Sequence, residues 1–174
     1  MKRFVLFLLL GLLGASAFAQ ESPLRDKGYK GSVSVSYAYP VYAGIETSHG
    51  YMFNSHHYLG VGAAAFLFPD GEKWPSFGEA YLAYQAYILK KDSTPFLGVK
   101  AGYVRDLAYR SKVEDSGNLD FHQGVTLQPE VGWSWAFRPG VGLSLSVGAD
   151  LIVPVGESYK KFYALPKLTV SFEF

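Results

Sequence analysis

Serine and histidine are the side chains that could give this chain nucleophilic or acid–base chemistry, and it contains only four histidines. Ser48 and His49 are neighbours in an alternating segment, so in a strand their side chains point to opposite faces. A serine nucleophile needs a histidine within hydrogen-bond reach, and adjacent strand residues do not provide that geometry. His122 has no obvious serine partner, and the sequence contains no G-x-S-x-G motif. We therefore expect no catalytic site and no enzyme.

His56 and His57 are the pair of residues that could bind a metal ion. As neighbours on a strand they too would point to opposite faces, so they cannot easily share one ion. The sequence has no cysteine, which excludes a thiolate metal site and a disulfide framework. We expect a polar turn at these histidines, no metal and no cofactor.

Charged side chains are placed singly along the polar faces of the alternating segments. They could line a conduction path, or they could pair with one another inside a narrow barrel. Buried charges need partners, and a barrel of eight strands is just wide enough for side chains to fill. We therefore expect a paired polar network in a packed interior, formed by Glu46, Lys100, Glu130, Asp150, Lys167 and Glu173.

The elements that would hold these residues are segments in which apolar and polar residues alternate with the period of a strand. There are eight, at residues 28–39, 41–53, 57–68, 77–89, 95–107, 122–137, 141–153 and 163–174. The seventh is the clearest, since Leu143, Leu145 and Val147 alternate with Ser144 and Ser146. Short connections at 53–56, 90–93 and 138–140 alternate with longer ones at 68–76, 109–121 and 154–162, although the first connection, at 39–42, is tight and breaks the trend. This pattern predicts an all-β, eight-stranded antiparallel up-and-down barrel.

The composition indicates which face of the barrel is outside. The assigned apolar faces contain no Asp, Glu, Lys or Arg, and the polar faces are mostly Gly, Ser and Ala with single charges. Charged residues make up 18% of the chain, below the usual quarter, which disfavours a soluble barrel with a densely charged surface. Aromatic residues make up 17%, which suits the aromatic girdles of membrane barrels. We expect a transmembrane barrel with its apolar face against lipid.

The first 19 residues have the pattern of a cleaved signal peptide. Lys2 and Arg3 precede an apolar run at 4–13 that is too short to span a bilayer as a helix, which disfavours a membrane anchor. Ala17 and Ala19 provide the small-x-small pattern read by signal peptidase. We therefore expect residues 20–174 to form the mature barrel domain. Its formal charge is 14 − 15 = −1, which offers no basic field to nucleic acid.

The last segment is typical of the strand that ends an outer-membrane barrel. Leu168, Val170, Phe172 and Phe174 lie on one face of an extended strand, and the residues between them are polar. This alternation matches lipid on one side and a polar lumen on the other. We expect segment 163–174 to pair with segment 28–39, which would leave no exposed edge.

Several segments carry a resemblance to known proteins: KGYKG at 27–31, TSHGYMFN at 47–54, LGVG at 59–62, PFLGVKAGY at 95–103, and the terminal phenylalanine. With them the mature chain resembles small eight-stranded outer-membrane proteins, such as the OmpX type and the membrane domain of OmpA. It looks most like the porin-like outer-membrane β-barrel proteins of Bacteroidetes-type bacteria. The resemblance implies that Phe172 and Phe174 help the outer-membrane assembly machinery to recognise the chain. It implies no particular activity.

The sequence thus predicts an integral outer-membrane barrel protein with a structural or surface-interaction role. The expected partners are outer-membrane lipid and lipopolysaccharide, the assembly machinery and, through the loops, an extracellular molecule; we expect a monomer. Trp74 in the charged loop 70–75 suits an interfacial girdle or a partner contact, and the acidic loop 112–120 suits solvent or a cation. Three other functions stay open: a narrow-pore porin, an enzyme that modifies lipid A, and a soluble lipocalin-like carrier.

Overall fold

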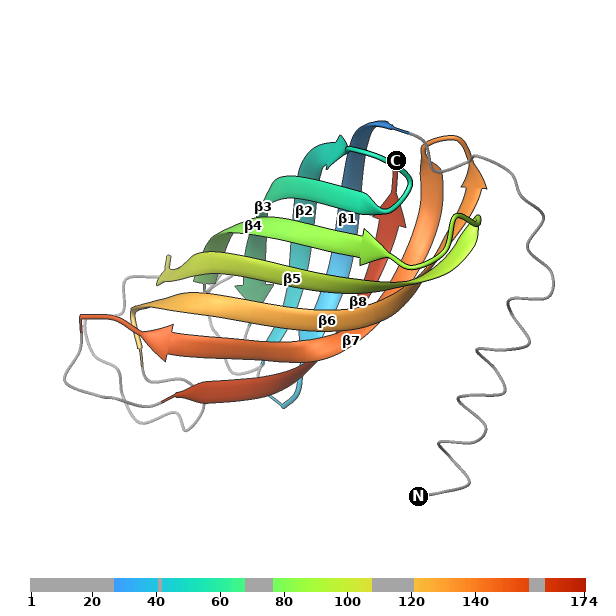
Figure 1. The fold of residues 1–174 in the computed structure, drawn as a ribbon. Coiled ribbons are helices and arrows are strands. Elements are labelled where there is room, and N and C mark those ends of the chain that lie inside the picture. The colour runs from blue at the N-terminus through green and yellow to red at the C-terminus, as the bar shows by residue number, and fades with distance from the viewer. Residues whose placement is uncertain (1–26, 41, 68–76, 108–120, 157–161) are drawn as a thin grey trace, which may run out of the picture.

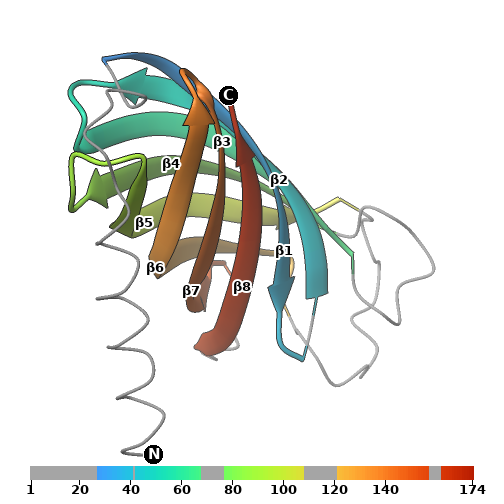
Figure 2. The ribbon, with the colours of Figure 1, turned by 90° about the vertical axis from the view of Figure 1, so that its right-hand side faces the viewer.

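Eight antiparallel strands form a closed barrel (Figures 1 and 2). The structure is a computed structural model that describes residues 27–40, 42–67, 77–107, 121–156 and 162–174. The strands are β1 (Gly28–Ala38), β2 (Tyr42–Met52), β3 (His57–Leu67), β4 (Phe77–Tyr87), β5 (Ser93–Asp106), β6 (Gln123–Arg138), β7 (Val141–Pro154) and β8 (Tyr163–Glu173). Each strand pairs with its neighbours in the sequence, and β1 pairs with β8.

The structure confirms the predicted eight-stranded, up-and-down barrel, and the strand ends differ from the predicted ones by at most two residues. The largest shift at a strand start is in β5, where Ser93 and Thr94 extend the strand by pairing with β6. The expected signal peptide at 1–19, the loop with Trp74 and the acidic loop lie outside the described residues. The described residues contain no helix long and apolar enough to cross a membrane.

The start of β1, the end of β8 and the three short turns lie at one end of the barrel, here called the turn end; the opposite end is the loop end (Figure 1). In the β2–β3 turn, the side-chain oxygen of Asn54 accepts hydrogen bonds from the backbone N–H groups of His56 (2.8 Å) and His57 (3.0 Å). Asparagine favours turns because it can bond its own backbone in this way. In the β6–β7 turn, Gly140 has φ +75°, a left-handed conformation that side chains disfavour.

The alternation of each strand separates an apolar outward face from a polar inward face. On β1, for example, Val33 and Val35 are exposed whereas Ser34 and Ser36 are buried. Charged side chains on the outward face of the described strands occur only near strand ends, at Arg105 and Arg138. The long apolar surface is therefore the outside of the barrel.

Large aromatic side chains also point inward. Three of them lie opposite a glycine on the neighbouring strand: Phe66 opposite Gly44, Tyr81 opposite Gly62, and Phe96 opposite Gly132. A Cβ atom added to Gly132 would lie 2.6 Å from the Phe96 ring, closer than real Cβ atoms approach other atoms. The glycines therefore provide the space that the rings fill in this narrow barrel.

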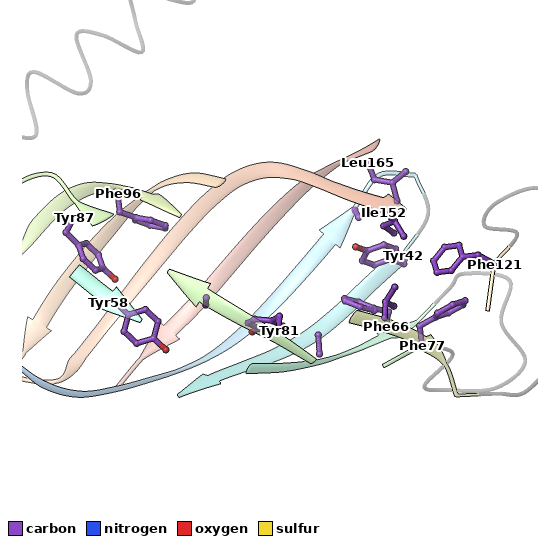
Figure 3. Packing of buried hydrophobic residues seen from close by; sticks show 14 of the residues in the cluster. Tyr42, Tyr58, Phe66, Phe77, Tyr81, Tyr87, Phe96, Phe121, Ile152 and Leu165 are labelled. Carbon is purple, nitrogen blue, oxygen red and sulfur yellow. The ribbon is translucent and has the colours of Figure 1, made fainter. Parts of the chain in front are cut away.

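Most of the inward aromatic residues gather in two groups towards opposite ends of the lumen, with Tyr81 between them (Figure 3). The turn-end cluster contains Tyr58, Tyr87 and Phe96. The loop-end cluster contains Tyr42, Phe66, Phe77, Phe121, Ile152 and Leu165. Ring centroids lie 5.7 Å apart for Tyr87 and Phe96, and 5.2 Å apart for Phe77 and Phe121, which is the spacing of packed aromatic pairs. Apolar packing therefore contributes to both ends of the lumen.

Candidate functional site

A buried carboxylate occupies the centre of the lumen. Glu46, on β2, is 1% exposed and lies between two lysines from other parts of the barrel wall. Its Oε2 is 2.7 Å from Nζ of Lys100 on β5, and its Oε1 is 2.5 Å from Nζ of Lys167 on β8. Both lysines are buried as well, so the three charges meet away from bulk solvent. Such pairs interact more strongly than they would in water.

A second carboxylate balances the charge of this group. Glu130, on β6, has Oε2 3.9 Å from Lys100 Nζ and accepts a hydrogen bond of 2.9 Å from Ser146. Lys167 donates a further bond of 2.9 Å to the side-chain oxygen of Gln128. The central cluster, defined as Glu46, Lys100, Glu130 and Lys167, therefore holds two positive and two negative groups.

A separate ion pair lies towards the turn end. Lys30 Nζ is 3.2 Å from Glu173 Oε1 and donates to Gln85 and to the Tyr87 hydroxyl. Ser134 donates to the Glu173 carboxylate at 3.0 Å. Sequence reasoning missed Lys30, although it shares the parity of the inward serines of β1.

Two further carboxylates lie towards the loop end. Glu79 accepts hydrogen bonds from Thr126 and, at 3.0 Å to each oxygen, from Gln128. Asp150 accepts a bond from the Tyr42 hydroxyl through Oδ2, whereas its Oδ1 is buried without a hydrogen-bond partner. Glu79 was not among the six residues predicted to form the network.

The structure thus directs all six residues of the proposed network into the barrel, but does not bring them into one group. Glu46, Lys100, Glu130 and Lys167 meet, while Glu173 pairs with Lys30 instead. Asp150 has no ion pair within 4 Å among the described residues. The odd or even position of a residue in a strand determines which face its side chain occupies. Its position along the barrel axis depends instead on the stagger of the strands.

The barrel wall encloses two small cavities. One, of about 20 Å³, lies between the turn-end cluster and the central cluster and is lined by Lys30, Lys100, Glu130 and several serines. The other, of about 10 Å³, lies at the loop-end cluster beside Glu79 and Asp150. A cavity of roughly 10–15 Å³ is the least that holds one water molecule. A larger, open hollow of about 380 Å³ lies at the turn-end mouth, beside Lys27, Arg138 and Phe174.

The histidines considered for chemistry lie at the outer surface or at the ends. Ser48 points inward and bonds the Tyr58 hydroxyl at 2.6 Å, whereas His49 points outward, where Nδ1 is 2.6 Å from the Tyr29 hydroxyl. His122 Nδ1 lies 3.5 Å from Asp106 Oδ2 at the loop end. Within the described ranges, no three His, Cys, Asp or Glu side chains gather closely enough to hold a metal ion.

Phe174 lies beside the β1–β8 seam. Its backbone N–H donates to the Gly31 carbonyl at 2.9 Å, and its carbonyl accepts from the Gly31 N–H at 2.6 Å. The Phe174 ring also covers Gly31, because a Cβ atom added there would lie 2.5 Å from it. Phe172, the other residue expected to act in assembly, is exposed on the outward face.

Solved structures with the same fold include natural and designed membrane barrels. The N-terminal β-barrel domain of Pseudomonas aeruginosa OprF has 11% identity and a TM-score of 0.59, covering 86% of this chain and 98% of that one. Neisserial surface protein A has 18% identity and a TM-score of 0.52, covering 84% and 94%. A de novo designed transmembrane β-barrel has 13% identity and a TM-score of 0.52, covering 90% and 98%. No protein-family model and no curated protein sequence matches the chain. At these identities the likeness concerns the fold, for which the predicted resemblance is confirmed.

Proposed function

We propose that this chain is an integral outer-membrane protein with a structural or surface-interaction role and a lumen closed to solutes. One observation carries the proposal: a closed barrel with an apolar outside and its charges inside. A membrane-spanning sheet must have no open edge and must direct apolar side chains to lipid. A soluble carrier barrel would have the opposite arrangement, with charges on its outer surface.

The strand lengths support the same proposal. Five of the strands contain 11 residues each, namely β1, β2, β3, β4 and β8. A strand needs about 9–11 residues to cross a bilayer when it is tilted. With the turn end towards the periplasm, the loops would face outward, where an extracellular partner could contact them.

Membrane fractionation together with gel migration tests the location. We expect the protein in the outer-membrane fraction, with an unheated band that migrates differently from the heated one because the barrel stays folded in detergent. The heated sample of the same preparation is the control. Recovery in the soluble periplasmic fraction would contradict the proposal and favour the carrier.

Planar-bilayer recording tests the closed lumen. The two aromatic clusters and the small cavities support a lumen that does not conduct. We expect no reproducible channel from purified, refolded protein, with a heat-denatured sample as the control. Stable unitary conductances would favour the narrow-pore porin instead.

A comparison of lipid A tests the absence of enzymatic activity. The outward His49 and inward Ser48 do not make a nucleophile–base pair, which supports a barrel without this chemistry. We expect identical lipid A masses in wild-type and deletion strains. A change in acyl chains that the wild-type gene reverses would favour the enzyme.

A further inference from the structure

Two exposed cations lie on neighbouring segments at the turn end. Lys90 belongs to the β4–β5 turn, and Arg138 is the last residue of β6. The turn is held against β6, because the backbone N–H of Ala136 donates to the Asp92 carbonyl at 2.7 Å. Lys90 precedes Asp92 by two residues and Arg138 follows Ala136 by two, while neighbouring strands lie about 4.8 Å apart. The two long side chains therefore start from the same part of the rim.

Neither cation is neutralised by an ion pair. Among the described residues, no carboxylate lies within 4 Å of Lys90 or Arg138. Lys91 and Asp92 also belong to the β4–β5 turn, but their opposite charges offset each other. Residues 20–27, 90–92 and 138 together contain five bases and three acids, so the charge of this rim stays positive when the segment before Lys27 is counted. An α-carboxylate at Phe174 would not reverse it.

The outward face next to these cations is apolar and aromatic. Trp135 and Phe137 are exposed near the end of β6, and Ile88 is exposed just before the β4–β5 turn. Aromatic side chains of transmembrane barrels gather at the two interfaces between lipid and water. Lys90 and Arg138 therefore lie at the level where lipid headgroups would meet the barrel.

We propose that Lys90 and Arg138 bind the phosphate of an anionic phospholipid from the membrane leaflet at the turn end, with its acyl chains against Trp135 and Phe137. An arginine can hold two phosphate oxygens at once, and the lysine adds a second positive charge. A phospholipid with a net negative charge fits better than a zwitterionic one, whose own cationic group offsets its phosphate. The inference rests on the membrane location proposed above and adds a lipid class and a binding site to it.

Quenching of tryptophan fluorescence by brominated lipid tests this site. The refolded mature barrel is placed in phosphatidylcholine vesicles that contain, at equal mole fraction, either brominated phosphatidylglycerol or brominated phosphatidylcholine. We expect the phosphatidylglycerol to quench more strongly, because it is enriched beside Trp135. Most of this excess should be lost in Trp135→Phe, which leaves the other tryptophans in place.

Variants of the two cations identify the residues that bind. One charge near a membrane surface changes the affinity for anionic lipid about fivefold. The preference for phosphatidylglycerol should therefore fall about fivefold in Lys90→Gln or Arg138→Gln and disappear in the double variant. Arg105→Gln is the matched control, because Arg105 is an exposed outward cation near the loop end, and it should leave the preference unchanged. Heat-dependent gel migration verifies that each variant is folded.

The outcomes separate this site from the membrane location on which it rests. Equal quenching of the wild type by the two brominated lipids would overturn the site but not the location, because both lipids would still reach the tryptophans. A preference that the double variant keeps, or that Arg105→Gln loses equally, would also overturn the site. Quenching by neither lipid would contradict the membrane location and the site with it. Should a variant not refold, the wild-type comparison decides.

Discussion

Replacing the central carboxylate should destabilise the barrel strongly. Glu46→Gln keeps the shape of the side chain but removes the negative charge from between two buried ammonium groups at 2.5 and 2.7 Å. Lys100 would keep Glu130 at 3.9 Å, whereas Lys167 would keep only the neutral Gln128 as a close partner among the described residues. Removing one partner of a buried ion pair costs about 3–5 kcal/mol, so we expect a loss in that range.

Urea unfolding in phospholipid vesicles, followed by tryptophan fluorescence, measures this loss. In the double variant Glu46→Gln with Lys167→Met, the uncompensated charge is removed as well. It should recover about 0.5–3 kcal/mol relative to Glu46→Gln, the range of coupling between residues in contact. Glu130→Gln is the control and should lose less than Glu46→Gln, because its lysine lies farther away. A loss below about 1 kcal/mol for Glu46→Gln, or no recovery in the double variant, would refute the reasoning.

Three further predictions concern the lumen, the outer face and the seam. Gly132→Ala should lower the free energy of unfolding by about 1–3 kcal/mol, because its methyl group meets the Phe96 ring; the same assay should show partial recovery with Phe96→Leu. Val147→Arg, midway along the outward face of β7, should cost about 2–4 kcal/mol in vesicles, and Val153→Arg near the loop end about 0–1 kcal/mol; equal losses would contradict a membrane-embedded belt. Phe174→Ala should reduce the fraction of heat-modifiable protein in cells, because it uncovers Gly31 at the seam, while Phe162→Ala should not.

The alternation of residue types was enough to predict the strands and their faces. Val33 and Ser34 show the alternation of apolar and polar residues with a period of two. A shift of the strand register by one residue would turn every side chain to the other face, so it is excluded where one face is buried. Most of the inward aromatic residues were missed because a barrel accepts aromatic side chains on both faces. Phe96 is an even number of residues from the inward Lys100 on the same strand, and this spacing was the available sign that Phe96 points inward. The glycine opposite Phe96, Gly132, can be identified only once the β5–β6 register is known.

The partners of the charged residues could not be predicted in the same way. Glu46 and Lys167 belong to β2 and β8, which are separated by β1, and Lys100 comes from β5. Their meeting depends on the stagger and tilt that bring residues from non-adjacent strands to one height. Lys30 was missed because it lies before the clear alternation of β1 begins, in a segment that contains Gly28 and Gly31.

The β1–β8 seam affects the order in which the strands pair during folding. The β1–β8 ladder runs from Ser32–Glu173 to Ala38–Lys167 and is followed by the Gly31–Phe174 backbone hydrogen bonds. It is shorter than the β5–β6 ladder, which runs from Ser93–Trp135 to Arg105–Gln123. Every other ladder joins strands that are consecutive in the sequence, whereas this one joins strands separated by most of the chain. Such distant pairing carries the largest entropic cost and forms late. A chain interrupted anywhere before β8 would therefore keep two unpaired strand edges, and cellular proteases could distinguish it from the finished protein by those edges alone.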